Sequence, residues 1–423
     1  MFSTPSAGLA RSEPGGYRSA SDVKPARPWV VLLATLTIQA LVAMALLTLP
    51  VVAPVVARSV GVPTTWVGGF VGVVYSAAML ASLLGGGAVR RWGALRLSQV
   101  GLACSTIGLC LCAIPHPVVM FIGAIFVGLG YGPITPASSH LLIKTTPPSQ
   151  LSLVFSVKQT GVPLGGMIAG ALVPSLDALI GWQLSFLAAG LMCALCAWAV
   201  QPLRAALDSD RDPTVRPSLV TSLVQPLRLV FSHKRLRTMV VISFLFAIFQ
   251  LSLATYLVTF LYEDLGWSLI FAGVALTVTQ AAGVGGRILW GFISDRWLGP
   301  IPMLLVITVL MAIGALGCAM LTSDTSLWLL FPILIVFGST AIGWNGVFLA
   351  EVARLAPPGQ AGLATGGSLC ITFLGIVAGP SLFGIMAGLV NSYGLSYGLL
   401  TLLAVGILVP LWRLRKHDQA GSI

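Results

Sequence analysis

Charged residues are scarce in this chain of 423 residues: Asp, Glu, Lys and Arg make up only 8% of it, against 57% hydrophobic residues. A soluble domain carries roughly a quarter charged residues, so this sequence cannot cover a water-exposed surface of ordinary size. The charges fall between apolar runs of roughly 18–28 residues, and about 20 apolar residues allow a helix to cross a bilayer. Barrel strands would instead alternate over short segments. The composition therefore predicts an all-α membrane protein.

Signatures of other protein classes are also missing. There is no Walker motif, which excludes an ATP-driven pump unless a partner supplies the ATPase. All seven cysteines lie in apolar runs, as small buried side chains do, so we expect no metal and no cofactor. The first 28 residues lack an apolar stretch followed by a cleavage site, which predicts a disordered cytoplasmic tail rather than a signal peptide. Basic patches interleaved with aromatics are absent, so the net charge of +11 does not indicate nucleic acid.

Apolar runs predict two sets of six helices, separated by one long charged stretch. The expected organisation is a tail at 1–28, a six-helix bundle at 29–201, a cytoplasmic linker at 202–236, a second bundle at 237–412 and a tail at 413–423. The individual helices are predicted at 29–57, 64–88, 97–114, 118–143, 151–175, 180–201, 237–262, 267–292, 301–322, 326–353, 361–388 and 393–412.

Basic residues are distributed unevenly between alternate loops. If the N-terminus is cytoplasmic, the inside segments hold 20 of the 23 Lys and Arg residues, whereas the outside loops hold only Arg58. This asymmetry follows the positive-inside rule. It predicts a multi-pass protein of the bacterial inner membrane with both termini in the cytoplasm.

Short motifs recur between the two halves. Pro147 to Gln150 (PPSQ) recurs as Pro357 to Gln360 (PPGQ), in matching inside loops. Such a duplicated six-helix unit is typical of parallel-repeat transporters. The stretch Gly291 to Gly299 (GFISDRWLG), with a first-half copy from Gly86 to Gly93 (GGAVRRWG), resembles the loop motif of the major facilitator superfamily. The resemblance covers essentially the whole chain and implies the major facilitator fold, with 12 transmembrane helices in two pseudo-symmetric six-helix bundles.

The first copy of the loop motif departs from the family pattern. It has Arg90 where the family usually places an Asp that pairs with neighbouring helix ends and latches the inward gate, whereas the second copy keeps Asp295. Sugar-type members of the superfamily are similar near the end of the tenth helix, where Glu351 lies, with an acid that pairs with loop arginines. The resemblance implies that Glu351 forms a gating ion pair with Arg296 or Arg354. A proton-coupling role for Glu351 is the alternative. The resemblance thus implies gating residues Arg90, Arg91, Asp295, Arg296, Glu351 and Arg354.

Two positive charges lie inside predicted helices, where a charge costs roughly 2.5–3.5 kcal/mol on insertion scales. Arg287 precedes Asp295 by eight residues, about 12 Å along a helix. Monocarboxylate and oxalate/formate carriers of the superfamily are similar, with a substrate-binding Arg at this spacing. Lys158 lies in the fifth helix, and its repeat mate is Ser368, so the scaffold does not require the charge. Either cation could bind a carboxylate. Snorkelling toward the inside face is the alternative for both, and pairing with Asp295 is a further alternative for Arg287.

Uncharged polar residues spaced i, i+4 share faces of four predicted helices. In the superfamily, helices 1, 4, 7 and 10 line the transport cavity, although each such residue could equally form a hydrogen bond between helices. Together with the two cations, the predicted substrate-binding residues are Arg287, Lys158, Gln39, Tyr131, Gln250, Tyr256, Trp344 and Asn345.

These features predict a secondary active transporter and not an enzyme. Two embedded cations, with no acid inside the first, fourth or seventh predicted helix, favour a small organic anion such as a carboxylate, moved by alternating access. An exporter of drugs or hydrophobic metabolites is the alternative, and a non-transporting membrane sensor is a minor one. We expect a monomer in the lipid bilayer that binds a small-molecule substrate, with coupling to a proton or a counter-anion left open.

Overall fold

The structure is a computed structural model that describes residues 28–147, 150–212, 214, 219–358 and 360–420. The predicted tail at 1–28 lies outside these residues apart from Pro28. Every regular element in the described ranges is helical. Twelve stretches among them are long and apolar enough to cross a membrane, which confirms the twelve-helix prediction.

The first half of the chain provides six of these spans. Its elements are α1 (Pro28–Val51), α2 (Ala53–Val60), η2 (Thr64–Trp66), α3 (Val67–Trp92), α4 (Ala94–Cys112), α5 (Pro117–Tyr131), α6 (Ile134–Thr145), α7 (Leu151–Gln159), α8 (Gly161–Ile180) and α9 (Trp182–Ala199). The linker contains η4 (Gln201–Leu203), α10 (Arg204–Leu207) and α11 (Leu219–Ser232).

The second half repeats the arrangement. Its elements are α12 (Lys234–Glu263), α13 (Leu269–Ile293), η5 (Ser294–Leu298), α14 (Pro300–Ala319), α15 (Leu327–Ala341), α16 (Asn345–Leu355), α17 (Ala361–Val390) and α18 (Tyr393–Ala420). Thus α12 begins three residues inside the predicted linker, and α18 continues into the predicted C-terminal tail.

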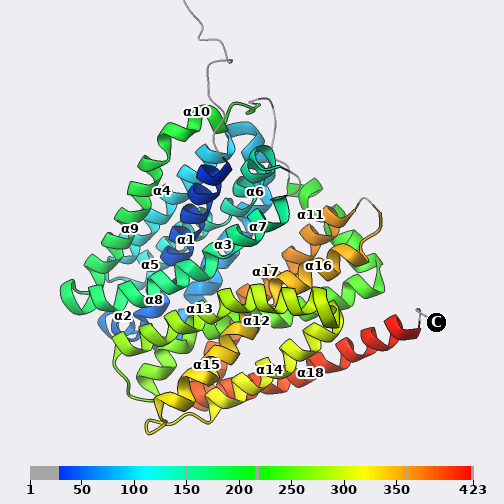
Figure 1. Ribbon diagram of the computed structural model, residues 1–423. Coiled ribbons are helices and arrows are strands. Elements are labelled where there is room, and N and C mark those ends of the chain that lie inside the picture. The colour runs from blue at the N-terminus through cyan, green and yellow to red at the C-terminus, as the bar shows by residue number, and fades with distance from the viewer. Residues whose placement is uncertain (1–27, 148–149, 213, 215–218, 359, 421–423) are drawn as a thin grey trace, which may run out of the picture.

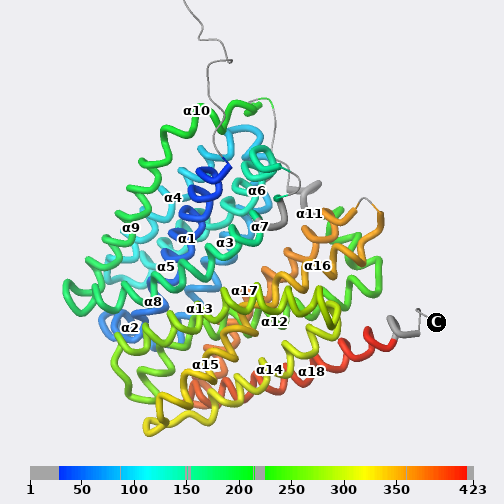
Figure 2. Tube along the Cα trace, in the orientation of Figure 1, coloured from blue at the N-terminus to red at the C-terminus, as the bar shows by residue number. Residues whose placement is uncertain are grey.

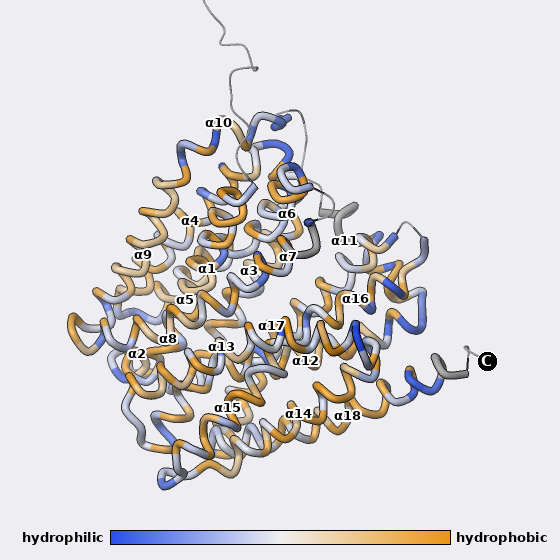
Figure 3. Tube along the Cα trace, viewed as in Figure 1, coloured by the Kyte–Doolittle hydropathy of each residue, from blue (hydrophilic) through white to orange (hydrophobic). Residues whose placement is uncertain are grey.

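The two halves form two bundles that meet along one seam (Figure 1). At this seam α8 packs against α13, and α3 packs against α17. The spans of α1 and α12 have the largest buried shares of the twelve, so these two helices lie at the centre. Hydrophilic residues gather near α10 and α11, whereas apolar residues dominate the flanks of the spans, as a bilayer requires (Figure 3).

Hydrogen bonds join the halves at the end that carries η2, here called the far end. Tyr256 Oη donates to Thr65 O at 2.9 Å, and Thr64 Oγ1 donates to Glu263 at 2.8 Å. The opposite end, which carries α10 and α11, is called the linker end. Toward it the two bundles diverge, with α6 on one side and α16 on the other (Figure 2). The structure is therefore joined most closely at the far end.

Four spans predicted as single helices are interrupted in the structure. The predicted helices at 118–143, 151–175, 326–353 and 29–57 each divide in two, as α5–α6, α7–α8, α15–α16 and α1–α2. Proline explains the second break, because Pro163 has no N–H to donate to the carbonyl of Gln159, four residues earlier. The periodicity of apolar residues predicts the apolar face of a span but does not predict where the helix is interrupted.

Close approach at the far end depends on Gly68, on α3. A Cβ at this position would overlap the carbonyl oxygen of Pro380 and the hydroxyl of Tyr256. Overpacking of this kind costs about 1–3 kcal/mol. We therefore expect Gly68→Ala to lower the thermal unfolding temperature of the purified protein. Gly69→Ala is the matched control, since a Cβ there meets no atom within 4 Å; equal unfolding temperatures for the two variants would contradict the packing described.

Candidate substrate site and gating contacts

The Arg287 side chain connects the two halves inside the membrane. It extends from α13, where Nη1 donates to Gln159 O at 2.7 Å and Nε donates to Ile342 O at 3.2 Å. Both acceptors stand at helix interruptions: Gln159 ends α7, and Ile342 follows α15. Carbonyls at helix C-termini carry partial negative charge and lack intrahelical donors. Within the part of the chain that the structure describes, Arg287 is therefore stabilised by backbone oxygens and not by a carboxylate.

A second cation, Lys158, lies beside Arg287. Its side chain is 1% exposed, and the two positive charges are close enough to interact electrostatically. Lys158 Nζ donates to the side-chain oxygen of Gln159, at 3.4 Å. Within the described residues, no carboxylate lies within ion-pair distance of either cation. Two like charges in a medium of low dielectric constant repel each other and attract an anion.

A polar network continues from Ile342 into the second half. The Ile342 carbonyl also faces Asn345 Nδ2 at 3.5 Å, and the same Nδ2 donates to Gln250 Oε1 at 3.3 Å. Trp344 Nε1 donates to that Gln250 oxygen at 3.1 Å. These three side chains therefore belong to one chain of hydrogen bonds that ends at Arg287.

Two tyrosines of the first half complete the surroundings of the cations. Tyr131, at the end of α5, interacts electrostatically with Arg287. Its ring packs edge-on against Tyr75 of α3, with ring centroids 5.8 Å apart. Sequence analysis did not select Tyr75, because a lone Tyr in an apolar helix resembles a core residue.

Gln39 of α1 is fully buried beside the junction of α7 and α8. A Cβ on Gly161 would meet the Gln39 side chain at 2.9 Å. Neither the amide nitrogen nor the amide oxygen of Gln39 has a hydrogen-bond partner among the described residues. A buried polar group without a partner costs about 1–3 kcal/mol. This amide is therefore available to a bound molecule or to water.

The structure thus gathers seven of the eight predicted substrate-binding residues around the interruptions of α7–α8 and α15–α16. Tyr256 lies elsewhere, in the far-end contact, where its ring stacks on Phe383 with centroids 5.0 Å apart. The spacing of polar residues predicts which face of a helix they share but not their depth in the membrane. Tyr256 therefore has the same spacing as the residues near Arg287 although it lies at the far end. Substrate binding by these residues remains a prediction.

The predicted gating residues fall into two groups. Glu351 on α16 is fully buried and pairs with Arg354 through two contacts of 2.6 and 2.7 Å, one of the two pairings expected. Asp295 and Arg296, in η5, are both exposed. The gating role itself is not tested by these contacts and remains a prediction.

Arg90 and Arg91, at the end of α3, are exposed, and the acid missing from their loop comes from the linker. The carboxylate of Asp208 accepts hydrogen bonds from the backbone N–H groups of Leu95 and Arg96, at 2.8 and 2.9 Å. Asp208 therefore caps the N-terminus of α4, a favourable position for a negative charge. Gly93, with φ of 96°, leaves the space that this carboxylate occupies.

Two more aspartates attach the linker to the first half. Asp210 accepts a hydrogen bond from Lys144 Nζ at 2.8 Å, and its other oxygen lies 2.8 Å from His140 Nε2. The Asp212 N–H donates to the Arg90 carbonyl at 2.7 Å. The linker aspartates thereby contact the linker ends of α3, α4 and α6. His140 takes part in this docking contact.

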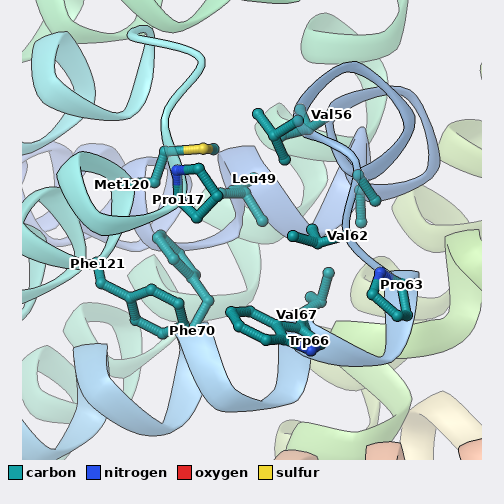
Figure 4. A pocket seen from close by; sticks show the side chains of 13 residues that line it. Leu49, Val56, Val62, Pro63, Trp66, Val67, Phe70, Pro117, Met120 and Phe121 are labelled. Atoms are coloured by element: carbon teal, nitrogen blue, oxygen red, sulfur yellow. The ribbon is translucent and has the colours of Figure 1, made fainter.

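A small, partly open pocket lies away from these groups. It measures about 50 Å³ and is formed by side chains of α1 to α3 and α5, among them Trp66, Phe70 and Phe121. Figure 4 shows only apolar side chains around it. Such a lining offers nothing to a charged substrate.

Twelve spans in two similar bundles, with cations at the seam, define the class of polytopic membrane transporters. The sequence matches the pattern of the Major Facilitator Superfamily over residues 33–380, and the chain belongs to that superfamily. It is accordingly a transporter and not an enzyme.

Relatives with known cargo include two carriers of aromatic acids. The benzoate transport protein of Acinetobacter baylyi is 23% identical, over 75% of this chain and 74% of its own. The gentisate transporter of Corynebacterium glutamicum is 28% identical, over 72% of this chain and 70% of its own.

Solved structures confirm the fold. A bacterial homolog to the human lysosomal transporter Spinster, inward-facing and unoccupied, aligns with a TM-score of 0.70 and 18% identity, covering 94% of this chain and 95% of that one. A D-xylose–proton symporter aligns with a TM-score of 0.67 and 18% identity, covering 90% and 96%. At such low sequence identity, the similarity shows only that the fold is shared.

The Asp210 contact predicts a pH-dependent contribution to stability. Burial would raise the pKa of Asp210, but hydrogen bonds from Lys144 and with His140 lower it below its usual value. The ionised carboxylate therefore stabilises the folded state above its unfolded pKa of about 3.9, and this is lost as pH falls through the folded pKa. Asp210→Asn should cost on the order of 0.5–1 kcal/mol at neutral pH, the range of exposed pairs.

The measurement is the unfolding temperature of both proteins from neutral pH down to about pH 3. The difference between wild type and Asp210→Asn should shrink in the acidic part of this range. Asp324→Asn, at an exposed loop position, serves as the control and should behave as the wild type. A difference that grew toward acidic pH would contradict the assigned contact.

Proposed function

We propose that this chain transports a small organic anion whose carboxylate binds between the two halves at Arg287 and Lys158. The observation that carries the proposal is the pairing of these two cations inside the membrane without a carboxylate partner among the described residues. Embedded charges are costly and normally face a partner or a substrate pathway. A substrate carboxylate supplies the missing negative charge.

The geometry leaves donors for such a group. A guanidinium has five N–H bonds, and Arg287 uses two of them on the carbonyls of Gln159 and Ile342. The remaining three can donate to a carboxylate, which a guanidinium matches as a fork. Lys158 adds a point charge with rotatable donors. Gln39 adds an amide that has no hydrogen-bond partner among the described residues.

The side chains around the cations favour an anion with an aromatic ring. Tyr131 and Tyr75 belong to the first half, and Trp344 belongs to the hydrogen-bonded network of the second half. Aromatic side chains pack on rings in stacked or edge-on arrangements. The carriers of benzoate and gentisate among the relatives agree with this chemistry, since both cargoes are aromatic carboxylates. We infer that an aromatic carboxylate is the preferred class of substrate.

The position of the proposed site at the seam supports alternating access. The halves are joined at the far end and diverge toward the linker end (Figure 2). Rocking of the halves about Arg287 would open the far end and close the linker end. The uneven distribution of basic residues supports placing the linker end in the cytoplasm, with the protein in a bacterial inner membrane.

Uptake of labelled benzoate by proteoliposomes tests the proposal. Arg287→Gln removes a charge-assisted hydrogen bond worth about 1.5–3 kcal/mol, so we expect uptake at low substrate concentration to fall at least about tenfold. Lys158→Gln should also lower uptake of benzoate. Arg287→Lys keeps the charge but not the fork and should restore only part of the uptake.

Controls separate recognition of the carboxylate from general damage. Arg415→Gln removes an equal charge from an exposed position on α18 and should leave uptake unchanged. Benzamide, a neutral isostere of benzoate, should neither compete for uptake nor raise the unfolding temperature, whereas benzoate should do both. The proposal fails if the Gln variants transport benzoate normally, or if a lipophilic cation is taken up in its place.

A further inference from the structure

Four arginines surround one hollow at the linker end of the first half. Arg91 lies in the last turn of α3, Arg96 lies in the first turn of α4, and Arg204 and Arg211 belong to the linker. The hollow measures about 640 Å³ and is lined by Arg91, Trp92, Arg96, Leu97, Val100, Arg204 and Arg211. A second hollow, of about 480 Å³, continues along the linker from Arg204 and Arg211.

The positive charge of this hollow is largely unbalanced. Arg204 lies 4.0 Å from Asp208, whose carboxylate is already engaged by the backbone of α4. For Arg91, Arg96 and Arg211, the described residues provide no acidic side chain within ion-pair distance. Docking of the linker therefore brings two of its arginines next to two others, although like charges repel. An anion in the hollow would remove this repulsion.

The floor of the same hollow is apolar and continuous with the lipid-facing side of α4. Leu97 and Val100 form the floor, and Val100 is 44% exposed. Two turns further along α4, Ile107 is 47% exposed. The apolar stretch of α4 that is long enough to cross a membrane begins at Ala94, so Arg96 lies in the first turn of this candidate span. Trp92, half-exposed beside it, is typical of a membrane–water interface.

We propose that this hollow binds the headgroup of an anionic phospholipid, with the phosphate among Arg91, Arg96, Arg204 and Arg211 and an acyl chain along Val100. Arginine suits a phosphate because its N–H groups match two phosphate oxygens. Basic pockets at the cytoplasmic side of transmembrane helices are a recurrent form of lipid recognition. A soluble phosphate would have the same charge but no use for the apolar floor. The bound lipid connects the linker to α3 and α4.

Native mass spectrometry of the purified full chain tests this assignment. The protein is titrated in detergent with phosphatidylglycerol and, separately, with phosphatidylcholine of the same acyl chains. We expect phosphatidylglycerol to bind the wild type, and the double variant Arg96→Gln/Arg211→Gln to bind it at least about tenfold more weakly, the equivalent of 1.4 kcal/mol. Both side chains are exposed, so helical content by circular dichroism should be unchanged.

Matched variants decide between specific and general charge effects. Arg413→Gln/Arg415→Gln removes the same charge from exposed positions on α18 and should retain wild-type binding. Arg96→Lys/Arg211→Lys keeps the charge and should bind more tightly than the Gln pair. Equal phosphatidylglycerol binding by the wild type and the Gln pair would overturn the proposal, as would equally tight binding of phosphatidylcholine. Displacement of the lipid by glycerol 3-phosphate at equal concentration would overturn it in favour of a soluble phosphate.

Discussion

The centre of this protein depends on placing a guanidinium between two interrupted helices. Arg287 is held by the carbonyls of Gln159 and Ile342, each at the end of a helix segment. Dipolar carbonyls reduce the cost of burying the cation but do not neutralise it. A carboxylate partner would have cancelled the charge and removed the attraction for an anion. Carbonyl oxygens therefore keep the cation in place while its charge remains available.

This arrangement also relates the site to the seam between the halves. Along α13, contacts with α8 occur at Gly273, Thr277 and Gln280, and Arg287 reaches α7 two turns later. A molecule that draws the guanidinium toward itself competes with the Gln159 carbonyl, an acceptor of the opposite half. A bound ligand and the contact between the halves thus compete for the same N–H groups of Arg287. This competition is a physical route by which a ligand can favour one conformation over another.

The sequence predicted the membrane spans and the two buried cations, but not the carbonyl oxygens that accept hydrogen bonds from Arg287. Hydropathy fixed twelve helices because a bilayer demands apolar runs, and a charge inside such a run is visible as an exception, which singled out Arg287 and Lys158. The carbonyls of Gln159 and Ile342 carry no side-chain signal. For Gln159, the sequence contains one indication, Pro163, because a proline has no N–H to donate to the carbonyl four residues earlier. Tyr256 has the same spacing pattern as Tyr131, but periodicity contains no information on depth.

The linker shows how a missing acid can be supplied from a distant part of the chain. Arg90 occupies the place of an acid in the loop motif, and Asp208 caps α4 beside it. Asp208, Asp210 and Asp212 all contact the first half, whereas α11 packs on α17 of the second. The carboxylate that caps α4 is thus part of the same half as α4, so a change in the angle between the halves leaves this cap intact. Such a cap stabilises one bundle as a rigid body, whereas the proposed rocking of the halves would have to break any latch between the bundles.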